Sequence, residues 1–340
     1  MREEGFVVSV GPHIQSGESV NKMVYGFIIA LLPTILASIY FLKMQAIQVI
    51  VASLVSAVIA DAIFQKIFKK EVDFINPHAI FVGLLFAAIM PVGMPWWAIP
   101  IGLFMGLLFG QYVYGGWGSN PFNPVLVGWA VLKLSYPGYM DISGSVLGAL
   151  KLEGIGALVE DYSYFSEGYG IEEISGFGAK LKLLFKILFE WKTGPWTDQL
   201  ISYVGGICAL AIIIGGLYLL WKRYISWHAP IGFILTVFVF SVLFYKGDKA
   251  YLYPYLLIQL FTGTTLLTAF FLVTDPITTP FTGIGMFIFG ILVGVVTMVG
   301  RLWGSWIEPA FFGVLVANSL TPLIDRVIKP KPFGRVKSSA

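Results

Sequence analysis

The polar residues best placed to do chemistry lie in one segment rich in glycine and proline, Gly115-Gly-Trp-Gly-Ser-Asn-Pro-Phe-Asn-Pro124. Glycines such as Gly118 free the backbone there, and Pro121 and Pro124 both fit the first turn of a following helix. Asn120 and Asn123 would lie at the N-terminus of that helix, where unpaired N–H groups and the positive dipole end favour electron-rich ligand atoms. The segment predicts a site for a flat heterocycle with carbonyl edges or an anionic group, unless the asparagines only cap the helix.

Three carboxylates are candidates for an ion path, although none belongs to a firm metal site. Asp275, in Thr274-Asp-Pro-Ile-Thr-Thr-Pro280, could help to coordinate Na⁺ or could hold its loop through side-chain-to-backbone hydrogen bonds. Glu308 precedes a proline at an expected helix start, where it could admit a cation or simply complement the helix dipole. Asp325 lies near the end of an expected helix and could face either a path or water.

These residues belong to a chain whose solvent must be lipid over most of its length. Of the 340 residues, 57% are hydrophobic and 12% are charged, against about 25% charged in soluble domains, and the mean hydropathy is +0.81. This composition excludes a disordered chain, a secreted disulfide scaffold and a nucleic-acid-binding module, and a net charge of +3 implies no polyanionic partner. The single cysteine, Cys208, cannot form an internal disulfide or a four-cysteine iron–sulfur site.

Continuous apolar runs of about 20 residues predict an all-α integral membrane protein with about ten transmembrane helices in the lipid bilayer. No small-residue cleavage site follows the first run, so we expect a retained helix rather than a signal peptide. The runs 78–91 and 121–136 are short for a bilayer about 30 Å thick, which favours tilted or interrupted helices. The ten runs are 23–42, 45–64, 78–91, 95–113, 121–136, 199–221, 227–245, 255–273, 282–299 and 309–324.

Lysine and arginine in the short loops indicate that both termini are cytoplasmic, with the chain in the inner membrane. In this orientation twelve such basic residues lie inside and four lie outside. The segment 137–198, which is richer in Asp, Glu, Ser, Gly and Tyr, then faces outward. We therefore divide the chain into a first five-helix membrane repeat (1–136), an extracytoplasmic segment (137–198) and a second five-helix repeat with a basic cytoplasmic tail (199–340).

Paired landmarks predict that the two halves form an inverted repeat. They occur in the same order in both halves and are Pro91–Pro95 with Pro276–Pro280, Ile101–Phe104 with Ile284–Phe287, Trp117–Ser119 with Trp303–Ser305, Asn123-Pro124 with Glu308-Pro309, and Gly128 with Gly313. An odd number of spans in each half places the two copies in opposite orientations. Many transporter folds are built in this way, with sites where interrupted helices meet.

With these motifs in view, the sequence resembles the D subunits of Rnf complexes, the ion-translocating ferredoxin:NAD⁺ oxidoreductases. It is more distantly similar to the B subunits of Na⁺-translocating NADH:quinone reductases. The resemblance covers nearly the whole chain and is carried by Val10–Gln15, Gly115–Pro124, Ile225–Pro230, Ala269–Pro276 and Ala317–Asp325. It implies a ten-helix inverted-repeat subunit that carries flavin and works with other membrane and peripheral subunits, on which the ferredoxin and NAD⁺ chemistry lies.

The resemblance also implies two flavins. One is a riboflavin near the inner ends of the helices, with Asn120 and Asn123 in its site. The other is an FMN esterified to a threonine of the outer segment, in a motif like Asp-x-Val-Ser-Gly-Ala-Thr. The best-spaced counterpart here, Glu172-Glu-Ile-Ser-Gly-Phe-Gly178, ends in a glycine that has no oxygen to esterify. We expect no covalent FMN; the alternatives are non-covalent FMN or attachment through Ser175.

We therefore predict an enzyme subunit, without a complete active site of its own, that passes electrons through bound flavin and contributes to Na⁺ or H⁺ translocation. Reduction adds negative charge in a low-dielectric site, and uptake of a cation nearby would compensate that charge. The residues alone leave two alternatives open. One is a secondary transporter or channel without a redox cofactor, and the other is a flavin-free structural scaffold of the complex.

Overall fold

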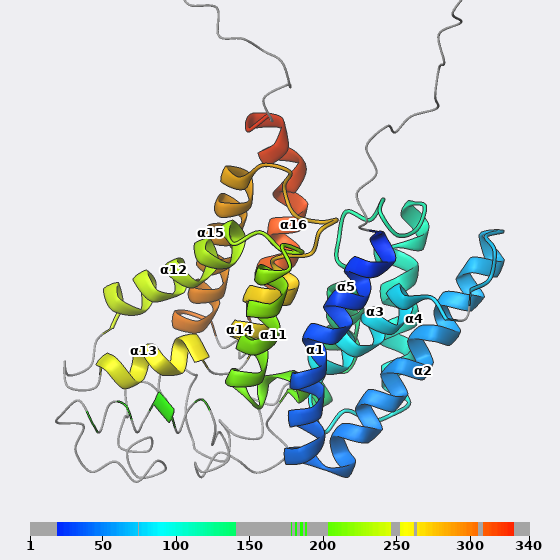
Figure 1. The fold of residues 1–340 in the computed structure, drawn as a ribbon, viewed down its shortest axis with the longest axis horizontal. Helices are drawn as coiled ribbons and strands as arrows, with labels where there is room; N and C mark the ends of the chain where they lie inside the picture. Colours follow the sequence, from blue (N-terminus) through cyan, green and yellow to red (C-terminus); the bar gives the residue numbers. More distant parts are fainter. Residues whose placement is uncertain are drawn as a thin grey trace, which may run out of the picture.

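Figure 1 shows the computed structural model, which is built from helices over the residues that it describes. These residues are 19–73, 75–140, 203–245, 252–261, 264–304 and 309–329, with the isolated positions 178, 181, 184, 185 and 188. Within them, strand-like pairing is limited to one bridge between Pro91 and Tyr203. The prediction of an all-α protein is confirmed for this part of the chain.

Four helices are long and apolar enough to cross a membrane. They are α1 (Val20–Leu42), α2 (Met44–Ile67), α15 (Gly283–Leu302) and α16 (Pro309–Val327). At a rise of about 1.5 Å per residue, their 19 to 24 residues match a hydrocarbon core about 30 Å thick. The chain is therefore a multi-pass membrane protein, as its composition predicts.

Five further apolar helices are too short to span a bilayer upright. They are α3 (Pro77–Ala88), α4 (Ala98–Gly110, followed by the turn η1, Tyr112–Tyr114), α5 (Pro124–Ser135), α11 (Ala209–Trp221) and α12 (His228–Leu243). Helices α3 and α5 have 12 residues each, about 18 Å. Both begin at an Asn-Pro pair, and a short helix, α6 (Pro137–Met140), follows α5. The prediction of short helices in runs 78–91 and 121–136 is confirmed.

Run 199–221 was expected to form one continuous helix, and this is wrong. Helix α11 begins only at Ala209, after a short turn, η3 (Val204–Gly206). That turn lies against the end of α3: Val204 N–H donates to the carbonyl of Met90 at 3.0 Å, and a Cβ on Gly205 would lie 2.7 Å from Ala88 Cβ. The chain approaches α3 too closely there for a helix with side chains.

Run 255–273 is also not a continuous helix. It forms α13 (Leu252–Phe261), α14 (Thr265–Leu267) and a π-helical turn, η5 (Thr268–Leu272), with a bend of 49° between the two parts. Side chains satisfy the backbone at the break, since Arg301 donates to the carbonyl of Gln259 at 3.0 Å and the Thr265 hydroxyl donates to it at 3.2 Å. Counted as one, this bent pair makes up to five candidate spans.

Close helix contacts assemble the core. A Cβ on Gly106 would lie 2.5 Å from the carbonyl oxygen of Pro124, so α4 and α5 touch through their backbones. Figure 1 shows α1 to α5 on one side of the molecule and α12, α15 and α16 on the other, with α11 between. The two sides also meet where the α5 ring of Trp129 packs edge-on against Phe311 of α16, with ring centroids 5.0 Å apart. Helix α1 begins and α16 ends at the same end of the molecule, the top in Figure 1.

Candidate functional site

The loop between η1 and α5 is shaped by its glycines. Gly115, Gly116 and Gly118 have φ values of 111°, 106° and 100°, a region that residues with a Cβ rarely adopt. Lys70, just beyond α2, donates from Nζ to the carbonyl of Gly115 at 2.7 Å. The loop thus folds back and presents the Asn-Pro start of α5.

Both asparagines of this loop are buried, with exposed fractions of 4% for Asn120 and 3% for Asn123. Asn123 caps α5, since its Oδ1 accepts from Val125 N–H at 2.9 Å. Its amide nitrogen donates across the molecule to Oδ2 of Asp275 at 3.0 Å. Asn120 holds its own loop, accepting from Gly118 N–H at 3.3 Å and donating to the carbonyl of Phe122 at 3.1 Å.

Asp275 lies in the loop that joins η5 to α15. Besides Asn123, its carboxylate accepts from the Thr278 hydroxyl at 3.1 Å and from Ile277 N–H at 3.3 Å. Burial raises the pKa of the Asp275 carboxyl above its ordinary value, and these three hydrogen bonds partly oppose that rise. The carboxylate therefore stands at the junction of the two halves of the chain.

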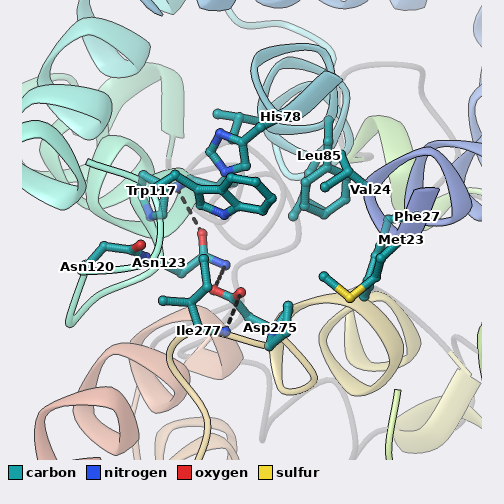
Figure 2. Close-up of a pocket in the computed structure, with 15 residues that line it drawn as sticks. Met23, Val24, Phe27, His78, Leu85, Trp117, Asn120, Asn123, Asp275 and Ile277 are labelled. Carbon is teal, nitrogen blue, oxygen red and sulfur yellow. Dashed lines mark hydrogen bonds between the residues drawn. The ribbon is translucent and has the colours of Figure 1, made fainter. Parts of the chain in front are cut away.

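Figure 2 shows the cavity that these loops enclose, with Asn123 and Asp275 below, the rings of His78 and Trp117 above, and an apolar wall from α1 and α3 to one side. Its volume is about 30 Å³. The lining is formed by Met23, Val24, Phe27, His78, Phe81, Val82, Leu85, Trp117, Asn120, Asn123, Pro124, Val125, Asp275, Pro276 and Ile277. The structure therefore brings together Asn120, Asn123 and Asp275, which the sequence places far apart.

The aromatic side of the cavity, formed by His78 and Trp117, was missed from the sequence. His78 lies in the first turn of α3 and is 5% exposed, and its ring centroid lies 4.5 Å from that of Trp117 at an interplanar angle of 30°. No described residue hydrogen-bonds its Nδ1 atom. The sequence feature that could have indicated this position is the pair Asn76-Pro77, which starts α3 in the same way as Asn123-Pro124 starts α5.

The other predicted site residues lie outside this cavity. Gly118 and Pro121 belong to the loop and do not line the cavity, and Asp325 of α16 accepts from Phe281 N–H at 3.1 Å. Ser175 and Glu308 fall outside the described residues. In the part of the chain that the structure describes, no three His, Cys, Asp or Glu side chains gather as a metal site would require.

A second polar cluster lies beside the site, around Asp61 of α2. This carboxylate is 1% exposed and accepts from Tyr112 Oη at 2.6 Å, from Gln65 Nε2 at 2.7 Å and from Asn76 Nδ2 at 2.9 Å. Asn76 also caps α3 by accepting from His78 N–H at 3.1 Å. Each of the two Asn-Pro helix starts is thus fixed by a partly buried hydrogen bond to an aspartate.

Comparison with known proteins identifies the family of this fold. Residues 7–334 match the model of the NQR2, RnfD, RnfE family. The chain belongs to this family. The NQR2, RnfD, RnfE family is the one that the sequence motifs indicate, and the match spans both halves and both loops of the candidate site.

Several relatives match over nearly their full length. The D subunit of the ion-translocating oxidoreductase complex of Mannheimia succiniciproducens is 30% identical over 97% of this chain and 98% of its own. The D subunit of a proton-translocating ferredoxin:NAD⁺ oxidoreductase complex from Clostridium ljungdahlii is 28% identical, over 97% and 96% of the two chains. Its counterpart in the Na⁺-translocating ferredoxin:NAD⁺ oxidoreductase complex of Acetobacterium woodii is 29% identical, over 99% and 98%. The last two names give different ions at nearly equal identity.

Proposed function

We propose that this chain is a membrane electron-transfer subunit of an Rnf-type complex, which passes electrons through bound riboflavin and contributes to Na⁺ or H⁺ translocation. Support comes from family membership and from relatives that are named as subunits of ion-translocating oxidoreductase complexes. Its partners are the other membrane and peripheral subunits of such a complex, which would carry the ferredoxin and NAD⁺ chemistry.

The observation that carries the flavin proposal is the cavity bounded by Asn123, Asp275, His78 and Trp117. Its donor set suits the polar edge of a heterocycle: the Asn123 amide has a second N–H beyond the one used on Asp275, and His78 Nδ1 has no described partner. Helices α3 and α5 both begin at the cavity, so their positive dipole ends favour electron-rich atoms there.

The size of the cavity, in contrast, means that side chains must move before riboflavin can bind. A cavity of about 30 Å³ holds water but not a tricyclic ring. The indole of Trp117 fills the flat space beside His78, and glycines with left-handed backbone flank it on both sides. We infer that Trp117 moves away from His78 when the ring of the riboflavin binds.

When bound, riboflavin would supply one- and two-electron redox chemistry, which protein side chains lack. The chain would contribute orientation through Asn123, a stacking surface through His78 or Trp117, and electrostatics through the two helix N-termini. Negative charge added at the cavity would be offset in part by those dipoles. Uptake of a cation close by would offset the remainder, which is a physical reason to couple electron and ion movement.

For FMN, we propose that this chain has no covalent attachment at the family position, since Gly178 stands where the family has threonine. Attachment through Ser175 and non-covalent binding are the competing outcomes. Acid precipitation of the purified chain tests this, because FMN on a peptide in the pellet would identify an attachment residue. Riboflavin in the supernatant above a flavin-free pellet is the expected result.

We propose further that the chain forms ten membrane segments in two inverted repeats, with both termini cytoplasmic and residues 137–198 outside. In support, the four long helices, the bent pair and the five shorter apolar helices lie in the ten apolar runs of the sequence. On a Cys208→Ser background, a membrane-impermeant maleimide should label Ser163→Cys in intact spheroplasts and Ser338→Cys only after lysis. The reverse pattern would contradict this topology.

The decisive test of the flavin site uses two matched asparagines. Asn123→Asp and Asn76→Asp each keep a helix cap, and each replaces an amide that donates to an aspartate, at 3.0 Å to Asp275 and 2.9 Å to Asp61. Only Asn123 lines the cavity. Acid-released riboflavin per chain, measured in the purified complex, should fall in Asn123→Asp and stay near the wild-type value in Asn76→Asp.

Equal flavin loss in both variants would show that helix capping, and not the cavity, is the cause. A flavin-free wild-type complex that still transfers electrons would replace the proposal with a structural scaffold. A colourless chain that moves a solute in liposomes would favour a transporter or channel.

A further inference from the structure

A second cavity lies beside the first and is not used by the proposed electron path. Its volume is about 360 Å³, within the range of sites that hold small ligands. It is bounded by the turn between α11 and α12 and by the segment from Val273 to Met286. Pro276 lines both cavities, so the Asp275 loop separates them.

One cation borders this cavity. Arg223 follows α11 and is exposed, and its guanidinium has no hydrogen-bond or ion-pair partner among the described residues. Its backbone has a φ of 59° and ends α11 with two hydrogen bonds, from Arg223 N–H to Leu220 and from Tyr224 N–H to Leu219, both at 3.0 Å. Glycine is usual at this position of a helix end, and an arginine there is less favourable for the backbone. Lys69 follows α2 with the same positive φ, so a basic residue in this backbone conformation is not unusual in itself. Arg223 differs from Lys69 in that it borders the cavity.

The remaining lining combines a few hydroxyls with an apolar wall. Ser226 borders the cavity and shares a hydrogen bond of 2.7 Å with His228, and helix α12 begins there without a side-chain cap. Ile225, Val273 and Met286 line the same cavity and supply its apolar surface. An occupant with an anionic group at one end and hydrocarbon behind it would match both parts of this lining.

Exposed aromatic side chains indicate the depth of the cavity in the membrane. Trp221 is 76% exposed and Phe281, which lines the cavity, is 83% exposed. Lys222 lies over the indole of Trp221, with its Nζ 5.0 Å from the ring centroid. Tryptophan with neighbouring basic residues is typical of the lipid headgroup region. The Asp325 carboxylate approaches the same segment but is bound to Phe281 N–H.

We propose that this cavity binds the phosphate headgroup of an anionic phospholipid, with Arg223 as its cationic contact and the apolar wall covering the first part of an acyl chain. Basic pockets between membrane helices bind anionic headgroups in this way. A soluble phosphate ion offers the same phosphate chemistry, but it would gain nothing from contact with the apolar wall. The proposal does not depend on flavin binding.

Native mass spectrometry of the full-length chain, titrated with phosphatidylglycerol or phosphatidylcholine, tests this proposal. Arg223→Gly removes the cation while giving the helix end its preferred residue, so the variant should fold. Lys69→Gly makes the same change in the same backbone conformation away from the cavity. We expect phosphatidylglycerol to bind at least about fivefold more weakly to Arg223→Gly and unchanged to Lys69→Gly.

A cavity-filling variant, Met286→Trp, should lose the lipid with all charges retained. Equal losses in Arg223→Gly and Lys69→Gly would reduce the effect to general surface charge and overturn the proposal. Unchanged binding in Arg223→Gly or in Met286→Trp would also overturn it. Displacement of phosphatidylglycerol by inorganic phosphate at similar concentration would assign the site to a soluble anion instead.

Discussion

Adding one methyl group at Gly128 should separate α5 from α4 and disturb the candidate site from a distance. An alanine Cβ there would lie 2.5 Å from the carbonyl oxygen of Gly102, whereas ordinary contact begins at 3.4 Å. Because the obstacle is backbone, the two helices must part by about 0.9 Å. Overpacking of this kind typically costs about 1–3 kcal/mol.

The same displacement would reach Asn123, which caps α5 one and a half turns before Gly128. The amide of Asn123 lies 3.0 Å from Asp275, and a shift of similar size would lengthen that contact to about 3.9 Å, too long for a hydrogen bond. We therefore expect Gly128→Ala to lower both the thermal unfolding midpoint and the riboflavin content of the purified full-length chain.

Gly138→Ala is the matched control, because a Cβ at Gly138 meets no atom within 4 Å. Both substitutions replace a helical glycine by alanine, so any gain in helix propensity is shared. Fluorescence-detected thermal unfolding in detergent, together with acid-released flavin, would compare the two variants. If Gly128→Ala matched Gly138→Ala in both measurements, the close approach of α4 and α5 would not position the site.

Three further outcomes are expected, each from thermal unfolding of the purified chain. Tyr112→Phe removes a 2.6 Å hydrogen bond to buried Asp61 and should cost about 1–3 kcal/mol. It should have little effect in an Asp61→Leu background, which has no acceptor at this position; equal effects in both backgrounds would contradict the contribution of this hydrogen bond. Burial raises the pKa of the folded-state Asp275 carboxyl above its ordinary value of 3.8. The protonated carboxyl therefore contributes its full share of the folding stability below pH 3.8, and this contribution is lost as the pH rises through the folded-state pKa. The thermal unfolding midpoint of Asp275→Asn should therefore rise relative to that of the wild type as the pH rises. A difference between the two midpoints that does not change with pH would refute the raised pKa of Asp275. Asn318 is 1% exposed with neither amide atom hydrogen-bonded to a described residue, so Asn318→Leu should stabilise the chain by about 1–3 kcal/mol; a loss of stability would instead indicate a bound water or ion.

The sequence predicts those parts of the fold that local chemistry determines. Asn123-Pro124 carries a cap and a fixed φ, and α5 begins there. The predicted run began three residues earlier, at Pro121, which lies in the loop before the helix. The long apolar runs form α1, α2, α15 and α16 within a few residues of the predicted bounds. The break after Phe261 was missed because a Thr-Gly-Thr-Thr segment remains compatible with a continuous apolar run, and only tertiary contacts such as Arg301 with Gln259 satisfy the opened backbone.

The sequence indicated several residues of the candidate site, but it did not indicate that they lie together. Asn120, Asn123 and Asp275 were each identified from local motifs, but that they line one cavity depends on how two distant loops pack. His78 carried no signal by itself, since a lone histidine in an apolar helix is usually structural. Its place in the cavity wall depends on the contact with Trp117, which lies between loop glycines with positive φ.

The hydrogen bond between Asn123 and Asp275 also has a consequence for biosynthesis. The two residues are 152 positions apart, which at about 5–20 residues per second places about 8–30 s of translation between them. During that interval the Asn123 amide must be satisfied by water or by lipid headgroups, with α5 already capped but its site unfinished. Loading of the proposed riboflavin would therefore have to follow synthesis of the second half of the chain. A ribosome that stalls before Asp275 would leave a fragment in which this cavity is incomplete.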